Sequence, residues 1–107
     1  MFDRRWRGKR SVHIISKKRL MAAGRRHPDA LAPLMRWYRV AKKALWNDVH
    51  EARADFPHAD PVGKFTVFNI KKNEYRLITV VHYNRFKIYV RAVLTHEEYN
   101  KGRWKDD

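Results

Sequence analysis

The 107-residue chain contains no cysteine. Disulfide bonds, thiolate metal ligands and cysteine nucleophiles are therefore excluded, and the composition fits a reducing compartment. No apolar run approaches the ~20 residues that a membrane-spanning helix needs, so no span and no membrane partner are expected. The basic N-terminus has no following apolar segment of the kind that a secretory signal requires. Together these absences predict a cytoplasmic protein.

Acidic residues are also scarce, with 11 Asp and Glu against 25 Lys and Arg, which gives a net charge of +14 and a pI near 10.6. A chain this small with such an excess of cations is expected to bind a polyanion. Nucleic acid is the leading candidate because its phosphates reward Lys and Arg through counterion release. An anionic membrane surface is the lesser alternative, and we do not expect it to be the partner.

The length and the 44% hydrophobic fraction predict one domain with a modest core, which we place at residues 12–107. Residues 1–11 form a basic N-terminal extension that contains Phe2 and Trp6. One interpretation is a disordered or cloned leader. The other is an accessory arm that binds RNA or phosphate.

Residues 64–99 predict the centre of the fold, an antiparallel sheet. Three runs rich in Val, Ile, Phe and Tyr, at 65–70, 75–82 and 87–94, are separated by short polar connections. These connections are too short for a crossover helix, so neighbouring strands are expected to be antiparallel. In the second run, alternation places Arg76 at the edge of an otherwise apolar face, which requires an explanation.

Two helices are expected before the sheet. Ser16 can cap a first helix that Gly24 and Pro28 end. Asp29 can cap a second helix that extends to residue 46, since apolar residues recur at spacings of three and four. The apolar stripe consists of Leu31, Leu34, Tyr38, Ala41 and Leu45.

Shorter features complete the prediction. Residues 12–15 are β-prone and could add one strand, and 49–54 predict a short helix or turn. Two prolines and a glycine predict a loop at 56–63. Thr95 and Glu98 match a capping box, so a helical turn is expected there.

No familiar motif for metal or nucleotide chemistry is present. None of the six histidines forms an i, i+4 pair, and the chain has neither a phosphate-binding glycine loop nor a Gly-x-Ser-x-Gly elbow. We therefore predict no metal site and no cofactor. Polar residues remain at the strand ends and in the tail: Lys64, Lys71, Lys72, Asn73, Arg76, His82, His96, Tyr99 and Lys101.

This set contains the residue types that a metal-free ribonuclease needs. One group must take the proton of a ribose 2′-OH, another must protonate the 5′-oxygen, and cations must stabilise the charge between them. Histidine can do either proton transfer near neutral pH, and arginine matches phosphate bidentately. Several of these residues also have a structural interpretation: His96 as a tail cap, Tyr99 as a packing residue, His82 as a structural residue at a strand end, and Lys71 with Lys72 as a solvated turn.

A family resemblance sharpens this interpretation. It is carried by His-Pro-Asp-Ala at 27–30, Ala-Asp-Pro-Val-Gly at 59–63, Asn-Glu-Tyr-Arg-Leu at 73–77 and Thr-His-Glu-Glu-Tyr at 95–99. In their order and spacing these words resemble HigB toxins, mRNA-cleaving members of the RelE superfamily from bacterial toxin–antitoxin pairs. The resemblance extends over residues 12–105.

The resemblance implies an α+β, RelE-like fold in which two N-terminal helices pack on a twisted antiparallel sheet of three to four strands. It also implies cleavage of mRNA on the translating 70S ribosome and inhibition by a HigA-type antitoxin with a helix-turn-helix domain. Whether such an antitoxin would cover the active face or add bulk elsewhere is left open.

Residue roles follow from the same resemblance. Arg76 is similar to the superfamily's phosphate-stabilising arginine, Tyr99 to a tyrosine that stacks on or orients a base, and His96 to a general acid or base. Lys64 and Lys71 are similar to the basic residues before the arginine strand. Together with Lys72, Asn73 and Lys101 from the set above they are the predicted RNA-binding residues.

Two other functions share the fold or the charge. ParE-like members of the superfamily inhibit DNA gyrase without cleaving RNA, and a basic domain can simply coat RNA. The histidine and tyrosine of the C-terminal word favour the nuclease.

Overall fold

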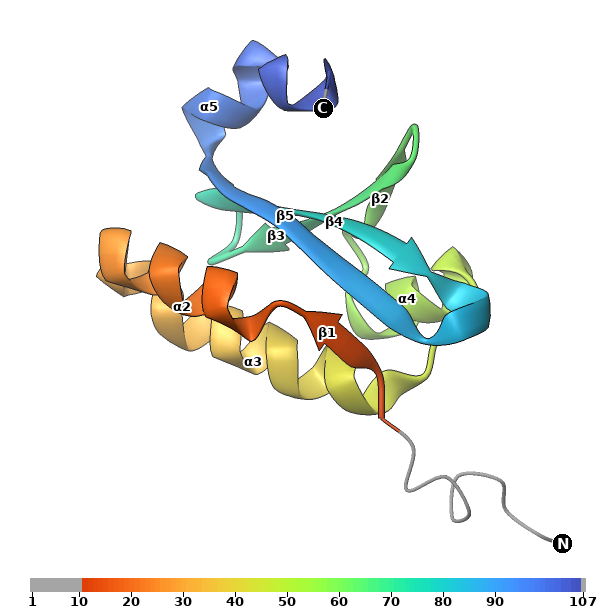
Figure 1. The fold of residues 1–107 in the computed structure, drawn as a ribbon. Coiled ribbons are helices and arrows are strands. Elements are labelled where there is room, and N and C mark those ends of the chain that lie inside the picture. The colour runs from red at the N-terminus through yellow and green to blue at the C-terminus, as the bar shows by residue number, and fades with distance from the viewer. Residues whose placement is uncertain (1–10, 107) are drawn as a thin grey trace, which may run out of the picture.

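The computed structural model describes residues 11–106 and confirms the α+β class (Figure 1). The predicted basic extension therefore lies outside the described residues except for Ser11. The elements in chain order are β1 (His13–Ile15), α2 (Lys17–Arg26), α3 (Pro28–Ala44), α4 (Val49–Asp55), β2 (Asp60–Val62), β3 (Phe65–Ile70), β4 (Tyr75–His82), β5 (Lys87–Thr95) and α5 (His96–Lys101), with 3-10 turns η1 at Tyr83–Arg85 and η2 at Arg103–Asp106. None of the described helices is long and apolar enough to cross a lipid bilayer.

The sheet has five strands in the order β1-β5-β4-β3-β2. The expected sheet of three to four antiparallel strands was therefore wrong in two respects. β1 pairs with β5 in parallel, while the other pairs are antiparallel. Alternation within a strand says nothing about a partner so distant in sequence, and therefore nothing about its direction.

The second difference from the expected sheet is an additional strand, β2, which lies in the segment expected to be a loop. Pro61 stands opposite Thr66 in the ladder between β2 and β3. A proline cannot donate to a ladder hydrogen bond, but an edge strand tolerates it because one side of the strand has no partner. The two prolines and the glycine of this segment predicted a loop, although its last part forms an edge strand.

Helices α2 and α3 cover one face of the sheet and build the larger core (Figure 1). Leu34, Trp37 and Ala41 of α3 are buried there together with Phe68 and Leu77 of the sheet. The rings of Trp37 and Phe68 meet edge to face with centroids 5.3 Å apart. Full burial of each large apolar side chain contributes about 1.5–3 kcal/mol, so the buried side chains of this layer stabilise the packing of the helices on the sheet.

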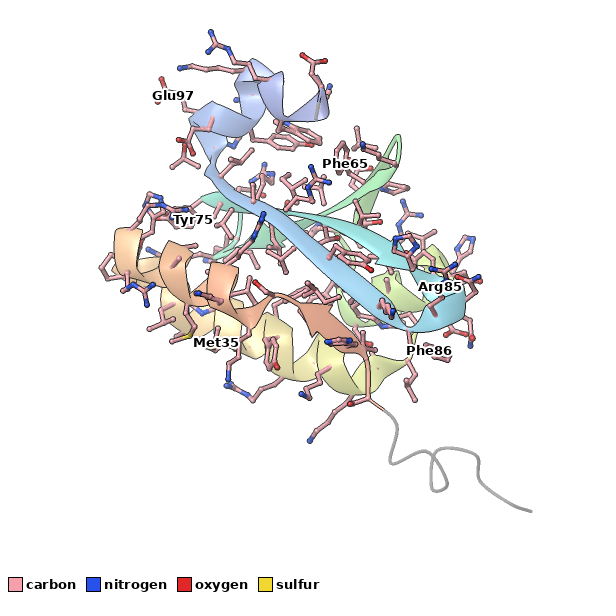
Figure 2. All side chains as sticks on the ribbon, viewed as in Figure 1. Met35, Phe65, Tyr75, Arg85, Phe86 and Glu97 are labelled. Atoms are coloured by element: carbon pink, nitrogen blue, oxygen red, sulfur yellow. The ribbon has the colours of Figure 1, made fainter. Side chains whose placement is uncertain are left out.

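The expected order of helices followed by sheet needs correction, because β1 precedes the helices and α4 and α5 come later. The C-terminal segment covers part of the opposite face. Trp104 packs there on Phe65, Val67 and Ile78 in a second, smaller cluster. Figure 2 shows Phe65 and Met35 on opposite sides of the sheet. The sheet is therefore covered on both faces at its β3–β4 centre.

Local capping agrees with the sequence at two helices and differs at one. Ser16 Oγ accepts a hydrogen bond from the Arg19 amide, and Thr95 forms the expected capping box with Glu98. The N-cap of α3 is His27 rather than Asp29, because Pro28 occupies the first helical position, where its missing N–H costs nothing. The same helix ends at Ala44, two residues early, since Leu45 adopts a left-handed conformation with φ of 52°.

A β-bulge interrupts the ladder between β4 and β5. Ile78 is opposite Ala92 and Thr79 is opposite Val90, so Arg91 has no partner residue on β4. The extra residue shifts the alternation along β5 by one position. Val90 and Val93 therefore both belong to the helix-covered core, and Arg91 is exposed between them.

Gly24 does not end α2, which continues to Arg26. A Cβ at residue 24 would lie 2.5 Å from Cδ1 and 3.1 Å from Cβ of Leu31 in α3. The glycine is therefore needed for the close approach of the two helices, although it lowers helix propensity. Spacing along the sequence does not show such a contact.

We expect Gly24→Val to lower the free energy of unfolding by about 1–3 kcal/mol, because the added side chain overpacks the contact with Leu31. Leu31→Ala should cost less in the Gly24→Val background than in the natural sequence. Urea unfolding of the single and double variants tests this coupling. Strictly additive effects would contradict the proposed contact.

Candidate active site

Arg76 lies at the start of β4 and is half-buried on the face that α5 approaches. Its Nη1 donates a hydrogen bond of 2.7 Å to the main-chain oxygen of Asn73, and its Nη2 lies 3.4 Å from Nδ1 of His96. In the ladder Arg76 stands between Asn69 of β3 and Leu94 of β5. The guanidinium is therefore held at the end of the sheet by partners that carry no negative charge.

The first turn of α5 brings His96 and Tyr99 to the same place. They are three residues apart on one helix, and neighbours at this spacing share a helix face. The His96 amide donates to the Glu74 carbonyl at 3.1 Å, which connects the helix start to the β3–β4 turn. The structure therefore unites the three predicted catalytic residues from two elements.

Tyr99 contacts Arg76 and Trp104 through its ring. The Arg76 guanidinium carbon lies 5.2 Å from the ring centroid, a cation–π distance, and the Trp104 indole stacks on the ring at 5.0 Å and 17°. The Trp104 indole N–H also donates to the Tyr99 carbonyl at 3.0 Å. Packing thus fixes the orientation of Tyr99, and its hydroxyl and ring edge are the parts left to meet a ligand.

Arg76 and Tyr99 line a groove of about 450 Å³ together with residues that the sequence analysis did not select. Arg53 contributes from α4, His58 from the loop between α4 and β2, and Asp60 from β2. Asn69 contributes from β3. The loop is held in place because Arg53 Nε donates to the Ala59 carbonyl at 3.0 Å and Phe56 packs on Phe68. His58 had only a neighbouring proline as its signal, which indicates a loop and no chemistry.

The predicted RNA-binding residues are dispersed. Asn73 supports the site directly, since its main-chain oxygen accepts from Arg76 and its Oδ1 accepts from Asn69 Nδ2 at 3.1 Å. The Lys71 amine instead binds Asp29 at 2.8 Å, at the start of α3. The remaining three, Lys64, Lys72 and Lys101, are exposed.

Residues 11–106 contain no group of three His, Cys, Asp or Glu side chains that is placed to hold a metal ion. The groove presents the guanidinium groups of Arg53 and Arg76, the imidazole of His58, the phenol of Tyr99 and the carboxylate of Asp60. The imidazole of His96 lies beside it, next to Arg76. Such groups can stabilise a dianionic phosphorane and move protons on either side of it.

Residues 30–102, which include Arg76, His96 and Tyr99, match the family model of the HigB toxin, described as the RelE-like toxic component of a toxin–antitoxin system. The chain belongs to the HigB toxin family. The mRNA interferase toxin HigB of Escherichia coli K12 is 30% identical over 92 residues, which cover 83% of this chain and 88% of that protein. The mRNA interferase HigB of Shigella flexneri has the same values, and that of Escherichia coli O6:H1 strain CFT073 is 29% identical over 93 residues, covering 84% and 90%.

Membership in the HigB family confirms the resemblance that was based on the short sequence motifs at 27–30, 59–63, 73–77 and 95–99. It identifies the protein as the toxic component of a toxin–antitoxin system. The match begins at Ala30, so α2 and β1 lie outside the matched segment.

A hydrogen-bond network centred on the carboxylate of Asp29 lies next to the β3–β4 turn that supports Arg76. Asp29 accepts hydrogen bonds from the Lys71 amine at 2.8 Å and from the Tyr75 hydroxyl at 2.7 Å. The bond from Lys71, followed by that from Tyr75, lowers the pKa of Asp29 below its ordinary value of 3.8. The bond to Asp29 raises the pKa of Lys71 above 10.5 and that of Tyr75 above 10.0. The network holds the turn that carries Asn73, and hence the carbonyl that binds Arg76.

These pKa shifts define a pH window for the network. A depressed carboxyl pKa gives stability that is present above pH 3.8 and is lost as the pH falls through the lowered value. The raised pKa of Tyr75 gives stability that is complete below pH 10.0 and is lost at higher pH. The network therefore stabilises the fold between about pH 4 and pH 10.

We expect Asp29→Asn to be less stable than the natural sequence near pH 7, and the difference to shrink below pH 3.8 as Asp29 takes up a proton. Chemical unfolding measured across the pH range tests this. Glu97→Gln is the matched control, since Glu97 extends from α5 away from the sheet (Figure 2). A stability difference for Asp29→Asn that persists unchanged at low pH would contradict the network.

Proposed function

We propose that this HigB-family toxin is an endoribonuclease that cleaves mRNA on the translating ribosome. The observation that carries the proposal is the position of Arg76, which contacts both His96 and Tyr99 and lines the groove together with Tyr99. The names of the curated relatives, mRNA interferases, support it independently.

The proposed reaction is an internal transfer that needs no metal ion. The 2′-oxygen attacks the adjacent phosphorus while its proton passes to a base on the enzyme. The bond from phosphorus to the 5′-oxygen breaks, and that oxygen takes a proton from an acid. The products are a 2′,3′-cyclic phosphate, which water can open to a 3′-phosphate, and a free 5′-OH.

Each role is assigned to a group whose position suits it. Arg76 stabilises the charge on the phosphorane because its guanidinium has no carboxylate partner among the described residues. His96, exposed beside it, transfers one of the two protons. Tyr99, held on Trp104, orients the nucleotide at the cleavage point.

The predicted RNA-binding residues keep more modest roles. Lys64, Lys72 and Lys101 are exposed and contact phosphates outside the reacting one. Asn73 acts by positioning Arg76. Lys71 acts as a phosphate clamp only if it exchanges Asp29 for a phosphate, because the two are paired in the free protein.

The partners are proposed on the same basis. A toxin–antitoxin family requires an antitoxin, and the resemblance favours a HigA-type partner with a helix-turn-helix domain. The net charge of +14 favours the RNA-rich surface of the ribosome as the place of action. Both belong to the cytoplasm, where mRNA is translated.

We expect Arg76→Ala to lower mRNA cleavage at least about 100-fold, since it removes the stabilising charge. Brief expression in bacteria followed by sequencing of mRNA 5′ ends is the measurement. The active protein should create new ends in frame within translated codons, and Arg76→Ala should lose them. Arg85→Ala is the control, because this exposed arginine lies at the opposite end of β4 from Tyr75 (Figure 2).

The fold of Arg76→Ala is checked by its unfolding curve. A folded variant that still arrests growth with the same 5′ ends would refute the assignment of Arg76. Arrest without new mRNA ends, accompanied by DNA damage and filamentation, would instead favour a ParE-like gyrase inhibitor.

His96→Gln tests the proton transfer separately. We expect cleavage of mRNA on programmed ribosomes to fall by about 10²–10⁴-fold, with the cleavage positions unchanged. Stability should be nearly unaffected because His96 is exposed. Products are examined for a 2′,3′-cyclic phosphate; a 3′-hydroxyl product would exclude attack by the 2′-OH.

A further inference from the structure

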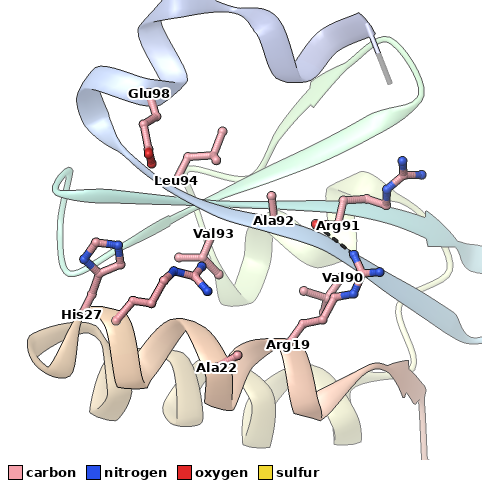
Figure 3. Close-up of a pocket in the computed structure, with 10 residues that line it drawn as sticks. Arg19, Ala22, His27, Val90, Arg91, Ala92, Val93, Leu94 and Glu98 are labelled. Carbon is pink, nitrogen blue, oxygen red and sulfur yellow. Dashed lines mark hydrogen bonds between the residues drawn. The ribbon is translucent and has the colours of Figure 1, made fainter.

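A groove lies between α2 and the outer edge of β5 (Figure 3). β1 pairs with β5 only as far as Tyr89, so beyond that residue the edge of β5 faces the helix instead of a strand. The groove has a volume of about 320 Å³, and a neighbouring hollow of about 480 Å³ shares Arg19, Val90 and Arg91 with it. We call the two together the β5-edge groove.

Three arginine residues line this groove. The side chain of Arg91 points away from α2, over the edge of β5 (Figure 3). The bulge leaves Arg91 exposed, and Arg19 Nη1 donates to the Arg91 carbonyl at 3.1 Å, which holds Arg19 across the groove (Figure 3). Arg26 lines it one helical turn beyond Ala22. Among the described residues the ion pairs involve Lys71, so none of these arginines is neutralised by a carboxylate. The positive charge is therefore available to a ligand.

One carboxylate, that of Glu98, lines the end of the groove. It accepts a hydrogen bond from the Thr95 amide at 2.9 Å as part of the capping box. Its charge is therefore partly compensated by the start of α5. With three arginines against one such carboxylate, the β5-edge groove favours an anion with several charges along its length.

Aromatic rings lie at the other end. His82 and Tyr89 line the second hollow, and their rings meet edge to face with centroids 5.2 Å apart. Both are half-buried and so present part of their surface to a ligand. Aromatic rings in a cationic groove are the usual combination for single-stranded nucleic acid, because bases stack while phosphates meet cations.

The groove begins beside the candidate active site. Leu94, which lines it, stands directly opposite Arg76 in the ladder between β4 and β5. Glu98 precedes Tyr99 in α5. A strand of RNA that leaves the Arg76 site over β5 therefore reaches the three arginines next.

We propose that the β5-edge groove binds the single-stranded RNA that flanks the cleaved nucleotide. Arg19, Arg26 and Arg91 contact its phosphates, and a base lies against the His82–Tyr89 pair. The inference rests on the proposed function and adds to it the route of the substrate. An added polypeptide strand fits less well, because the Arg91 carbonyl already accepts a hydrogen bond from Arg19.

Binding is measured without cleavage, in an Arg76→Ala background, by fluorescence anisotropy with a single-stranded RNA dodecamer and a trinucleotide. The groove variant combines Arg26→Gln with Arg91→Gln; Arg19 is retained because it bonds to β5. The matched control combines Arg36→Gln with Arg39→Gln, which removes the same charge from exposed positions of α3.

We expect the groove variant to bind the dodecamer at least 10-fold more weakly and the control variant to change less than 3-fold. The slope of log affinity against log salt should fall by about 1.4 in the groove variant, since two phosphate contacts are lost. The trinucleotide should bind all proteins alike. Tyr89→Leu should weaken dodecamer binding roughly fivefold or more without changing that slope.

Equal losses in the groove and control variants would refute the proposal, because they would show a general effect of charge. Groove variants that bind RNA normally but escape neutralisation by the antitoxin would also refute it, and would assign the groove to an acidic polypeptide. Neither result depends on cleavage. If mRNA 5′ ends support the nuclease while the groove variants bind RNA like the control, only this inference fails.

Discussion

The burial of β4 on both faces is the constraint on which the rest of the structure depends. Leu77 and Ile78 are adjacent in sequence, point to opposite faces and are 0% and 1% exposed. Antiparallel sheets commonly leave one face in water, but this strand is apolar on both. The α2–α3 layer covers the first face, so the chain beyond β5 must return over the second, where Trp104 is buried. That return places His96 and Tyr99 beside Arg76.

The electrostatics of the site follow from which charges are paired. Asp29 and Glu74 pair with Lys71, on the α3 side of the sheet. Arg76 instead has a carbonyl, an imidazole and a phenol ring as its partners. Neutral partners fix the guanidinium without cancelling its charge, which is what phosphate recognition needs. The same separation leaves the arginines of the β5-edge groove without carboxylate partners among residues 11–106.

Folding and chemistry share several residues in this toxin. The capping box that starts α5 also presents His96, and the ring that packs on Trp104 also contacts Arg76. The bulge that keeps Val90 and Val93 in one core also exposes Arg91 at the groove. A small domain has little interior, so its binding groups lie on the elements that build the core.

Much of the fold was predictable because it is encoded locally. Alternation determined β3, β4 and β5, the spacing of apolar residues determined α3, and single side chains determined the caps at Ser16 and Thr95. Arg76, His96 and Tyr99 were predicted from short words, and their proximity depends on a contact between chain segments twenty residues apart.

Only the tertiary structure decided the features that depend on distant partners. The pairing of β1 with β5, the strand that contains Pro61, and the contact of Gly24 with Leu31 have no local signal. The same is true of Lys71, whose partner Asp29 is 42 residues away, and of His58, whose loop meets the groove through packing. By itself the sequence determined the periodicity of the apolar residues, the caps at Ser16 and Thr95 and the net charge, because these depend on residues close together along the chain or on composition alone. Partners, directions and the shape of the site required the fold, because they depend on which distant surfaces bury one another.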